Sequence, residues 1–319
     1  MITHLKNAKR ILIASHIHPD GDAIGSLVAM GLALSQMGKQ VVMYNECPVP
    51  KVYRFMEGVQ NIIKDIDDFS SFDTAIILDC ADLVRIGKSA DEVAGIPLLI
   101  NIDHHATNTG FGQIKNIDVS ACSTAEIVYD MLKQLDVDIS RNIAEAIYVG
   151  VLTDTGSFRF ANTTEEAFRI SKEMVALGAN PYKVADQIYG TYSLGSIKLL
   201  HKILGSIEVS QNGKLSILSL TQKMINETGT HPEDIIGLVH YAKHIKDVKV
   251  AALIQEAPGT GKCDSGTLFH VSLRSNGSVD VGAIASTYGG GGHPNSAGFS
   301  TKLNYFDLKK QMFKYAETM

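Results

Sequence analysis

Histidine, aspartate and serine residues cluster in one stretch of the N-terminal half of this chain, His16-Ile17-His18-Pro19-Asp20-Gly21-Asp22-Ala23-Ile24-Gly25-Ser26. An apolar run, Ile11 to Ala14, precedes this stretch, and a run typical of a helix, Leu27 to Met30, follows it. This order predicts a buried strand, a loop and a helix, with polar side chains at the carboxyl end of the strand. The loop offers several possible ligands for a metal ion or a proton, namely His16, His18, Asp20, Asp22 and Ser26.

Further apolar runs follow along the first half of the chain. We expect strands at residues 10–15, 40–44, 74–79 and 98–103, with a helix from Ala23 to Met37 that Gly38 stops. Further helices are expected at residues 123–135, 142–152 and 163–177, and Ser123 with Glu126 forms the pattern of a capping box. Strands that alternate with helices predict an α/β fold, a doubly wound and mostly parallel sheet covered on both faces.

The character of the sequence changes near Tyr189. Antiparallel strands are expected at residues 215–220, 248–255 and 268–275, with few helices between them. We therefore predict a first domain at residues 1–188, a linker at 189–204 and a smaller α+β domain at 205–319.

Composition narrows the class of protein. The chain has 319 residues, of which 45% are hydrophobic and 20% charged, as in an ordinary globular protein. Its net charge of −5 argues against a protein that coats nucleic acid. The four cysteines form no C-x-x-C pair, which argues against a structural zinc site or a disulfide framework. We see no signal peptide and no run long enough to span a membrane, so a cytoplasmic enzyme without membrane association is expected.

Acidic and histidine side chains gather behind the predicted strands and helices of the first domain. Asp79 ends one apolar run, Asp103-His104-His105 ends another, and Thr153-Asp154-Thr155-Gly156 follows a buried helix. Carboxylates that share one site repel each other, and cations relieve that cost. Carboxylate and imidazole ligands without thiolate suit Mn²⁺, Mg²⁺ or Fe²⁺, with Zn²⁺ also allowed. Two such ions would polarise a phosphoryl group and activate water.

These motifs together resemble the DHH–DHHA1 phosphoesterase family, and in particular its oligoribonuclease and pAp-phosphatase branch, over essentially the whole chain. The resemblance implies that His16 and Asp20 bind one metal ion, that Asp22, His104 and Asp154 bind the other, and that Asp79 bridges both. It implies a catalytic role for His105, with Asp103 orienting the histidines. Two divalent ions are expected, Mn²⁺ first, with Mg²⁺, Fe²⁺ or Co²⁺ as alternatives.

The C-terminal domain carries the motif Tyr288-Gly289-Gly290-Gly291-Gly292-His293-Pro294. Consecutive glycines let backbone N–H groups approach an anion closely. The resemblance implies that Gly290, Gly291, Gly292 and His293 contact the substrate, and that Arg274 grips a phosphate. Arg85 and Arg159 follow Asp79 and Asp154 closely, so either one could also reach a phosphate or could simply lie at the surface.

We therefore predict hydrolysis of short oligoribonucleotides of two to five nucleotides to 5′-mononucleotides, of 3′-phosphoadenosine 5′-phosphate (pAp) to AMP, or of both. Alternatives are a phosphodiesterase for cyclic or linear dinucleotides, an inorganic pyrophosphatase or exopolyphosphatase, and a non-catalytic nucleotide-binding module. A homodimer is compatible with the family, although no stretch indicates an interface. The sequence of residues 258–263 resembles part of a P-loop motif. Glu256 occupies the position of the first glycine of that motif, however, which favours a hairpin loop instead. No motif surrounds His231, His240 or His244.

Overall fold

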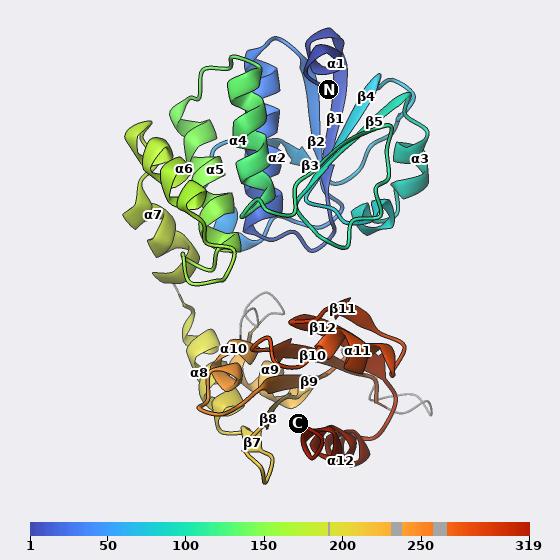
Figure 1. Ribbon diagram of the computed structural model, residues 1–319, viewed down its shortest axis with the longest axis vertical. Helices are drawn as coiled ribbons and strands as arrows, with labels where there is room; N and C mark the ends of the chain where they lie inside the picture. Colours follow the sequence, from blue (N-terminus) through green and yellow to red (C-terminus); the bar gives the residue numbers. More distant parts are fainter. Residues whose placement is uncertain (191, 231–237, 258–266) are drawn as a thin grey trace. The chain divides into compact units, whose positions relative to one another are not determined.

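The structure is a computed structural model that describes residues 1–190, 192–230, 238–257 and 267–319. The chain divides into two compact units, Met1–Thr191 and Tyr192–Met319 (Figure 1). The segment predicted as a linker, 189–204, includes helix α8 (Leu194–Leu204), whose Leu199 and Ile203 are buried in the core of the second unit. Residues 231 and 258–263 lie outside the described residues.

The first unit contains a six-stranded sheet in which every pairing is parallel, in the order β3-β2-β1-β4-β5-β6. The chain winds outward from β1 in both directions, so the switch point lies between β1 and β4. This confirms the predicted α/β fold. The strands are β1 (Arg10–Ser15), β2 (Gln40–Tyr44), β3 (Ile62–Ile63), β4 (Thr74–Leu78), β5 (Leu98–Asp103) and β6 (Ile114–Ile117).

Alternate residues of the central strands enter two different cores, because successive side chains of a strand point to opposite faces. Ile11 and Ile13 of β1 pack against helices α2, α4, α5 and α6, whereas Leu12 and Ala14 pack on the other face, where α3 lies (Figure 1). The helices are α1 (Ile2–Asn7), α2 (Gly21–Gln36), α3 (Ala90–Ala94), α4 (Thr124–Gln134), α5 (Arg141–Asp154), α6 (Glu165–Ala176) and α7 (Pro181–Ala185), with short turns η1 (Lys51–Tyr53), η2 (Val59–Asn61), η3 (Leu83–Ile86) and η4 (Asp186–Gly190).

Helix starts in this unit follow from local capping. Asp20 accepts hydrogen bonds from the N–H groups of Asp22 and Ala23, which begins α2 directly after the loop that follows β1. Ser123 accepts from the N–H of Glu126 and begins α4, while the Glu126 carboxylate accepts from the N–H of Cys122. The predicted box is therefore present, although its second bond reaches one residue further back than in the usual motif.

The second unit has a mixed six-stranded sheet in the order β11-β12-β10-β9-β8-β7, in which β8 and β9 are parallel and the other pairs antiparallel. Helices α11 and α12 pack on one face, and α8, α9 and α10 on the other. The elements are β7 (Glu208–Val209), β8 (Leu215–Leu220), β9 (Val250–Glu256), β10 (Phe269–Ser275), β11 (Gly291–His293), β12 (Ser296–Thr301), α9 (Gln222–Thr228), α10 (Val239–Lys243), α11 (Val281–Ser286) and α12 (Tyr305–Ala316).

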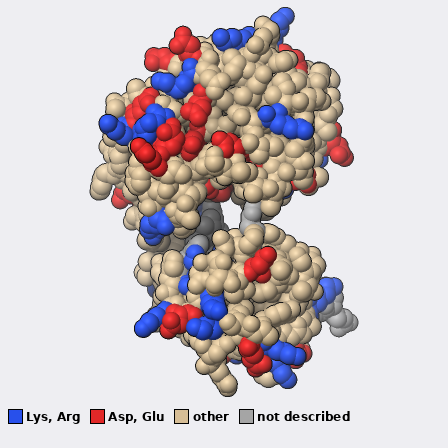
Figure 2. Space-filling view, in the orientation of Figure 1, with Lys and Arg blue, Asp and Glu red and all other residues tan. Residues whose placement is uncertain are grey.

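Charged side chains of both signs are interspersed on the face that Figure 2 shows. Among the described residues, no helix is both long enough and apolar enough to cross a membrane.

Candidate metal centre

The acidic and histidine side chains of the first unit meet at the carboxyl ends of β1, β4 and β5. His16 directly follows β1, Asp79 directly follows β4, and Asp103 ends β5, with His104 and His105 behind it. Asp20 and Asp22 begin α2, and Asp154 is the last residue of α5. The sheet order places β1, β4 and β5 side by side, so residues far apart in the sequence are brought to one edge.

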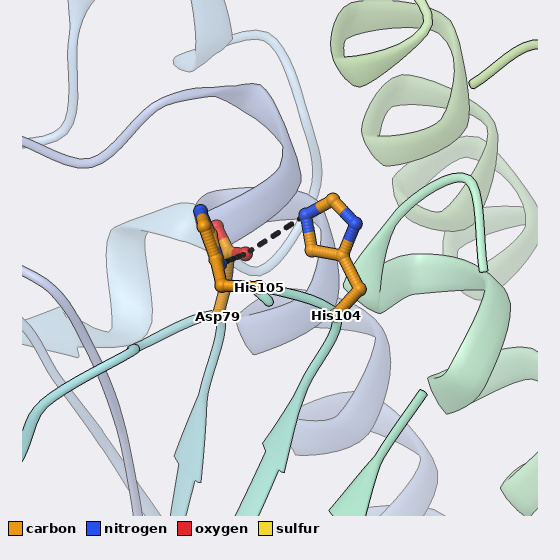
Figure 3. A group of neighbouring side chains, drawn as sticks. All are labelled: Asp79, His104 and His105. Carbon is orange, nitrogen blue, oxygen red and sulfur yellow. Dashed lines mark ion pairs between the residues drawn. The ribbon is translucent and has the colours of Figure 1, made fainter. Parts of the chain in front are cut away.

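Three groups of these side chains are close enough to hold a metal ion, since within each group the candidate ligand atoms lie within 4.8 Å of one another. The groups are His16–Asp20–Asp79, Asp22–His104–Asp154 and Asp79–His104–His105. Asp79 belongs to two groups and His104 to two. Figure 3 shows Asp79 together with His104 and His105, next to the ends of the strands.

Asp79 is the centre of this arrangement. It is 1% exposed, and its backbone adopts a left-handed conformation with φ of 56°. Its Oδ2 faces His16 Nε2 at 3.5 Å, and its Oδ1 faces His104 Nε2 at 3.7 Å and His105 Nδ1 at 3.6 Å. A left-handed conformation is costly for a residue other than glycine, and such strain concentrates at functional sites.

The rings of His16 and His104 are held by backbone carbonyls on the side away from the carboxylates. His16 Nδ1 lies 2.8 Å from the carbonyl oxygen of Ile17, and His104 Nδ1 lies 3.3 Å from that of Ala121. A carbonyl oxygen only accepts, so it favours the tautomer with the proton on Nδ1. The Nε2 lone pair of each ring then faces the carboxylates, as a metal ligand requires.

The N-terminus of α4 points at Asp22, which sequence reasoning did not anticipate. The N–H of Thr124 donates to Asp22 Oδ2 at 2.6 Å, and the N–H of Ala125 donates to Asp22 Oδ1 at 2.9 Å. The Thr124 hydroxyl donates to Asp79 Oδ1 at 3.0 Å. Ser26, predicted as a possible ligand, is buried and donates its hydroxyl to Asp22 Oδ1 at 3.3 Å.

Asp103 is fully buried and orients the residues behind β5. Its Oδ1 accepts from the N–H of His104 at 2.9 Å and lies 2.7 Å from His105 Nδ1. Its Oδ2 accepts from Asn108 Nδ2 at 2.6 Å. Asn108, which the sequence did not single out, also donates to the carbonyl oxygen of Cys80 at 3.2 Å and so connects the loops after β5 and β4.

Asp154 is held by a second asparagine. Asn162 Nδ2 donates to Asp154 Oδ2 at 3.0 Å and to the carbonyl oxygen of Cys122 at 2.8 Å. Between these two residues the chain makes a left-handed turn, with φ near 60° at three consecutive residues: 58° at Gly156, 61° at Ser157 and 61° at Phe158. Only the glycine suggests such a conformation from the sequence.

Protonation equilibria show how strongly the carboxylates repel each other. Burial, with the charges of Asp79 and Asp154, raises the pKa of Asp22 well above its ordinary value. Burial also raises the pKa of Asp154 to about 7, although His104 opposes this and Asp79 adds to it. Burial alone would raise the pKa of Asp79, but when His16 is protonated on both nitrogens its Nε2–H donates to Asp79, and this bond together with the charges of His16, His105 and His104 lowers the pKa to about 2. A divalent cation would remove the repulsion.

His105 differs from the other two histidines, because a carboxylate holds its Nδ1. Burial would lower the pKa of His105, but the hydrogen bond with Asp103 and the charge of Asp79 raise it to about 9. The ring of His105 meets that of His104 edge-on, with centroids 4.8 Å apart.

The other predicted residues of the first unit lie at the surface. His18 is exposed, has a φ of 55°, and its Nδ1 lies 3.8 Å from Cys47 Sγ. Arg85 is exposed, and its carbonyl oxygen accepts from the N–H of Ile17 at 2.7 Å. Arg159 is exposed, and its Nε donates to the carbonyl oxygen of Gly156 at 2.6 Å.

In the second unit, Arg274 lies on β10 and is partly buried. Its Nη1 donates to the carbonyl oxygen of Leu273 at 2.9 Å, and burial lowers its pKa. The glycine motif leads into β11, and the side chain of His293 lies outside the described part of the structure, as does that of His240.

Close packing accounts for two of the glycines. A Cβ atom at Gly290 would lie 2.2 Å from the carbonyl oxygen of Gly298, and one at Gly292 would lie 2.5 Å from that of Ser296. A Cβ atom added at Gly291 would meet no other described atom within 4 Å apart from those of its chain neighbours. The motif therefore lies directly against β12, and Gly291 has room beside it.

Comparison with protein families gives two matches. Residues 10–151 match the model of the DHH family, N-terminal domain, and residues 212–317 match the model of the DHHA1 domain.

Individual proteins match over most of the chain. The sequence is 32% identical to the bifunctional oligoribonuclease and PAP phosphatase NrnA of Thermus thermophilus, over 92% of this chain and 84% of that protein. It is 25% identical to the protein of the same name from Bacillus subtilis, over 91% of this chain and 88% of that protein. A crystal structure of an exopolyphosphatase-related protein from Bacteroides fragilis matches with a TM-score of 0.90 and 27% identity, over 98% of this chain and 95% of that one.

Proposed function

We propose that this chain, which belongs to the DHH family and carries a DHHA1 domain behind its DHH domain, releases 5′-mononucleotides from short oligoribonucleotides and phosphate from pAp. Its relatives named oligoribonuclease and PAP phosphatase are hydrolases, and so is this chain. The observation that carries the proposal is the set of three overlapping ligand groups around Asp79.

The donor atoms of these groups fit divalent cations. They are carboxylate oxygens and imidazole nitrogens, without thiolate, which suits Mn²⁺ and, after it, Mg²⁺, Fe²⁺ or Co²⁺. In this proposal His16 and Asp20 hold one ion, Asp22, His104 and Asp154 hold the other, and Asp79 serves both. Bound ions would supply Lewis acidity toward a phosphoryl oxygen and would lower the pKa of water.

The protein's own residues supply position and charge. Several ligands are held in place before any ion binds. The backbone N–H groups of Thr124 and Ala125 hold Asp22, and backbone carbonyl groups hold the rings of His16 and His104. Asp103 accepts a hydrogen bond from Nδ1–H of His105, which fixes the orientation of that ring. We infer that His105 stabilises the negative charge of the phosphoryl group and gives a proton to the leaving oxygen.

Substrate binding is assigned to the second unit. Arg274 is a partly buried cation whose Nη1 donates to the backbone carbonyl of its neighbour Leu273, and a guanidinium group has further N–H donors with which it could bind a phosphate. Among the described residues, none would contact a Cβ atom added at Gly291, which suits a close approach by an anion to this backbone. His293 joins them in this proposal, and Arg85 and Arg159 are candidates for further phosphate contacts.

A pyrophosphatase or exopolyphosphatase is the second candidate, since the Bacteroides fragilis protein of similar fold is called exopolyphosphatase-related. Product analysis with Mn²⁺ separates the two candidates. A 5′-labelled diribonucleotide, pAp and pyrophosphate are incubated in parallel with wild-type protein and with Asp79→Asn. Mononucleotide and AMP from wild type alone support the proposal. Cleavage of pyrophosphate alone favours the second candidate, and equal rates for the two proteins would exclude catalysis at this centre.

A further inference from the structure

Among the described residues of the second unit, helices cover one face of the sheet over only part of its width. Ser216 of β8, Ala251 of β9, Arg274 of β10 and Ser296 of β12 are paired in one row across the sheet. Helix α10 packs over the β8 end of this row, where the Ser216 hydroxyl donates to the carbonyl oxygen of Ala242 at 3.0 Å. Toward β12 the same row becomes polar.

In the next two rows, too, the residues at the β8 end lie under helices and the residues toward β12 are polar or small. Leu218 and Leu253 lie under the helices, and their row continues to Ser272 and Gly298. The third row runs from Leu220 through Gln255 to His270 and Ser300. All of the β10 and β12 residues on this face are at least partly exposed, and we call them the polar strip: His270, Ser272, Arg274, Ser296, Gly298 and Ser300.

The polar strip is positively charged. Neither the strip itself nor its β9 neighbours, Ala251, Leu253 and Gln255, include an acidic residue. Lys243 lies at the end of α10, one residue after Ala242, and its pKa is lowered by burial and then by the charge of Arg274. Two cations therefore share one end of the strip, which is unfavourable unless an anion joins them.

The other end of the strip carries a prearranged polar pair. His270 Nδ1 lies 2.7 Å from Ser300 Oγ, directly across the two strands. Between the two ends the strip consists of serine and glycine, whose small side chains do not project far from the sheet. Arg274 lies four residue steps along the strand from His270, about 13 Å, which is more than one phosphate group can span.

We propose that the polar strip binds the sugar–phosphate backbone of an oligonucleotide across more than one nucleotide. Arg274 and Lys243 bind one phosphate, and His270 with Ser300 contacts the neighbouring nucleotide. The strip would then favour oligonucleotides over pAp. This inference rests on the proposed function for its substrate, but it can be tested through binding alone.

The test uses the full-length protein with Mn²⁺ and a fluorescent tetraribonucleotide whose phosphorothioate linkages resist hydrolysis, alongside unlabelled pAp as a competitor. The variants are His270→Ala, His270→Gln and Lys243→Ala. His201→Ala is the matched control, because His201 is an exposed histidine on α8. His270 is exposed as well, so its replacement should leave the fold intact, which melting curves check.

We expect His270→Ala to weaken tetranucleotide binding about tenfold relative to pAp binding, as the loss of a hydrogen bond to a charged group predicts. Glutamine, which keeps a donor near Nε2, should recover part of the loss. Lys243→Ala should weaken both ligands, and His201→Ala neither. An unchanged ratio of the two affinities in His270→Ala overturns the inference, even if the protein cleaves both substrates. Normal binding without turnover would instead refute the proposed function and leave the strip in place.

Discussion

The hydroxyl of Thr124 donates a hydrogen bond to Oδ1 of Asp79 at 3.0 Å, while the backbone N–H of the same threonine donates to Asp22 at 2.6 Å. Asp79 and Asp22 belong to different ligand groups. One residue at the start of α4 therefore fixes two carboxylates that would otherwise move apart, since both carry negative charge when ionised.

Thr124→Val should weaken metal binding without unfolding the protein. Valine has nearly the same shape as threonine and keeps the backbone donor to Asp22, but it removes the hydroxyl bond to Asp79. Loss of such a supporting bond typically costs about 10- to 100-fold in metal affinity or activity. Calorimetric titration with Mn²⁺ measures the affinity. Thr124→Ser restores the hydroxyl and should bind nearly as wild type does; equal losses in both variants would mean that the hydroxyl is not the cause.

Asp79→Asn should remove the stabilisation that metal ions give. At an ion concentration 100 times Kd, binding adds about 2.7 kcal/mol to the free energy of unfolding. Without the Asp79 carboxylate, we expect the rise in Tm with added Mn²⁺ to fall to a small fraction of that in wild type. Asp91→Asn is the control, because Asp91 is exposed on α3 and belongs to none of the ligand groups. A wild-type rise in Asp79→Asn would place the ions elsewhere.

Much of the centre could be predicted because its residues directly follow strands. The strand at 74–79 ends in an aspartate, and the carboxyl ends of parallel strands meet at one edge, so local pattern and topology together bring Asp79 near His16 and His104. The predicted helix at 142–152 is α5, which extends two residues further and carries Asp154 into the centre.

The supporting residues could not be predicted, because their contacts depend on how whole elements dock. Ser123 indicated where α4 begins, but nothing in the sequence shows that its first N–H groups meet Asp22, which lies more than a hundred residues earlier. Asn108 and Asn162 stand in loops without any motif, and each connects two loops or helix ends that only the folded chain brings together.

Asn108→Ala should destabilise the loop after β5 and lower activity through His105. The substitution leaves Asp103 Oδ2, which is fully buried, without its 2.6 Å donor. An unsatisfied buried group costs about 1–3 kcal/mol, and more if it is charged. Urea unfolding measures the free energy of unfolding, and the rate with pAp measures the effect on the site.

Asn108→Asp extends this test to pH. A second carboxyl group next to Asp103 would have a raised pKa in the folded state because of burial and like charge. The folded state is then favoured when that group holds its proton, so the variant should lose stability as pH rises and regain it as pH falls. Asn108→Ala provides the reference, since it adds no titrating group. Parallel pH dependences in the two variants would contradict a direct contact with Asp103.

Gly150→Ala should perturb the metal centre by overpacking. A Cβ atom at this position of α5 would lie 2.5 Å from the Cβ of Ala125 and 2.8 Å from Oδ1 of Asp22. Overpacking a well-packed core costs about 1–3 kcal/mol, and here the displaced group is itself a candidate ligand. Gly31→Ala in α2 is the matched control, because the three atoms nearest to the added methyl group all belong to the flexible side chain of Met43, with Sδ at 2.2 Å, and a thioether can move aside. Alanine also favours a helix by about 1 kcal/mol over glycine. We therefore expect Gly31→Ala to keep its stability and its Mn²⁺ affinity in urea unfolding and calorimetry, and Gly150→Ala to lose both. Loss of stability with unchanged Mn²⁺ affinity in Gly150→Ala would separate this helix contact from the centre.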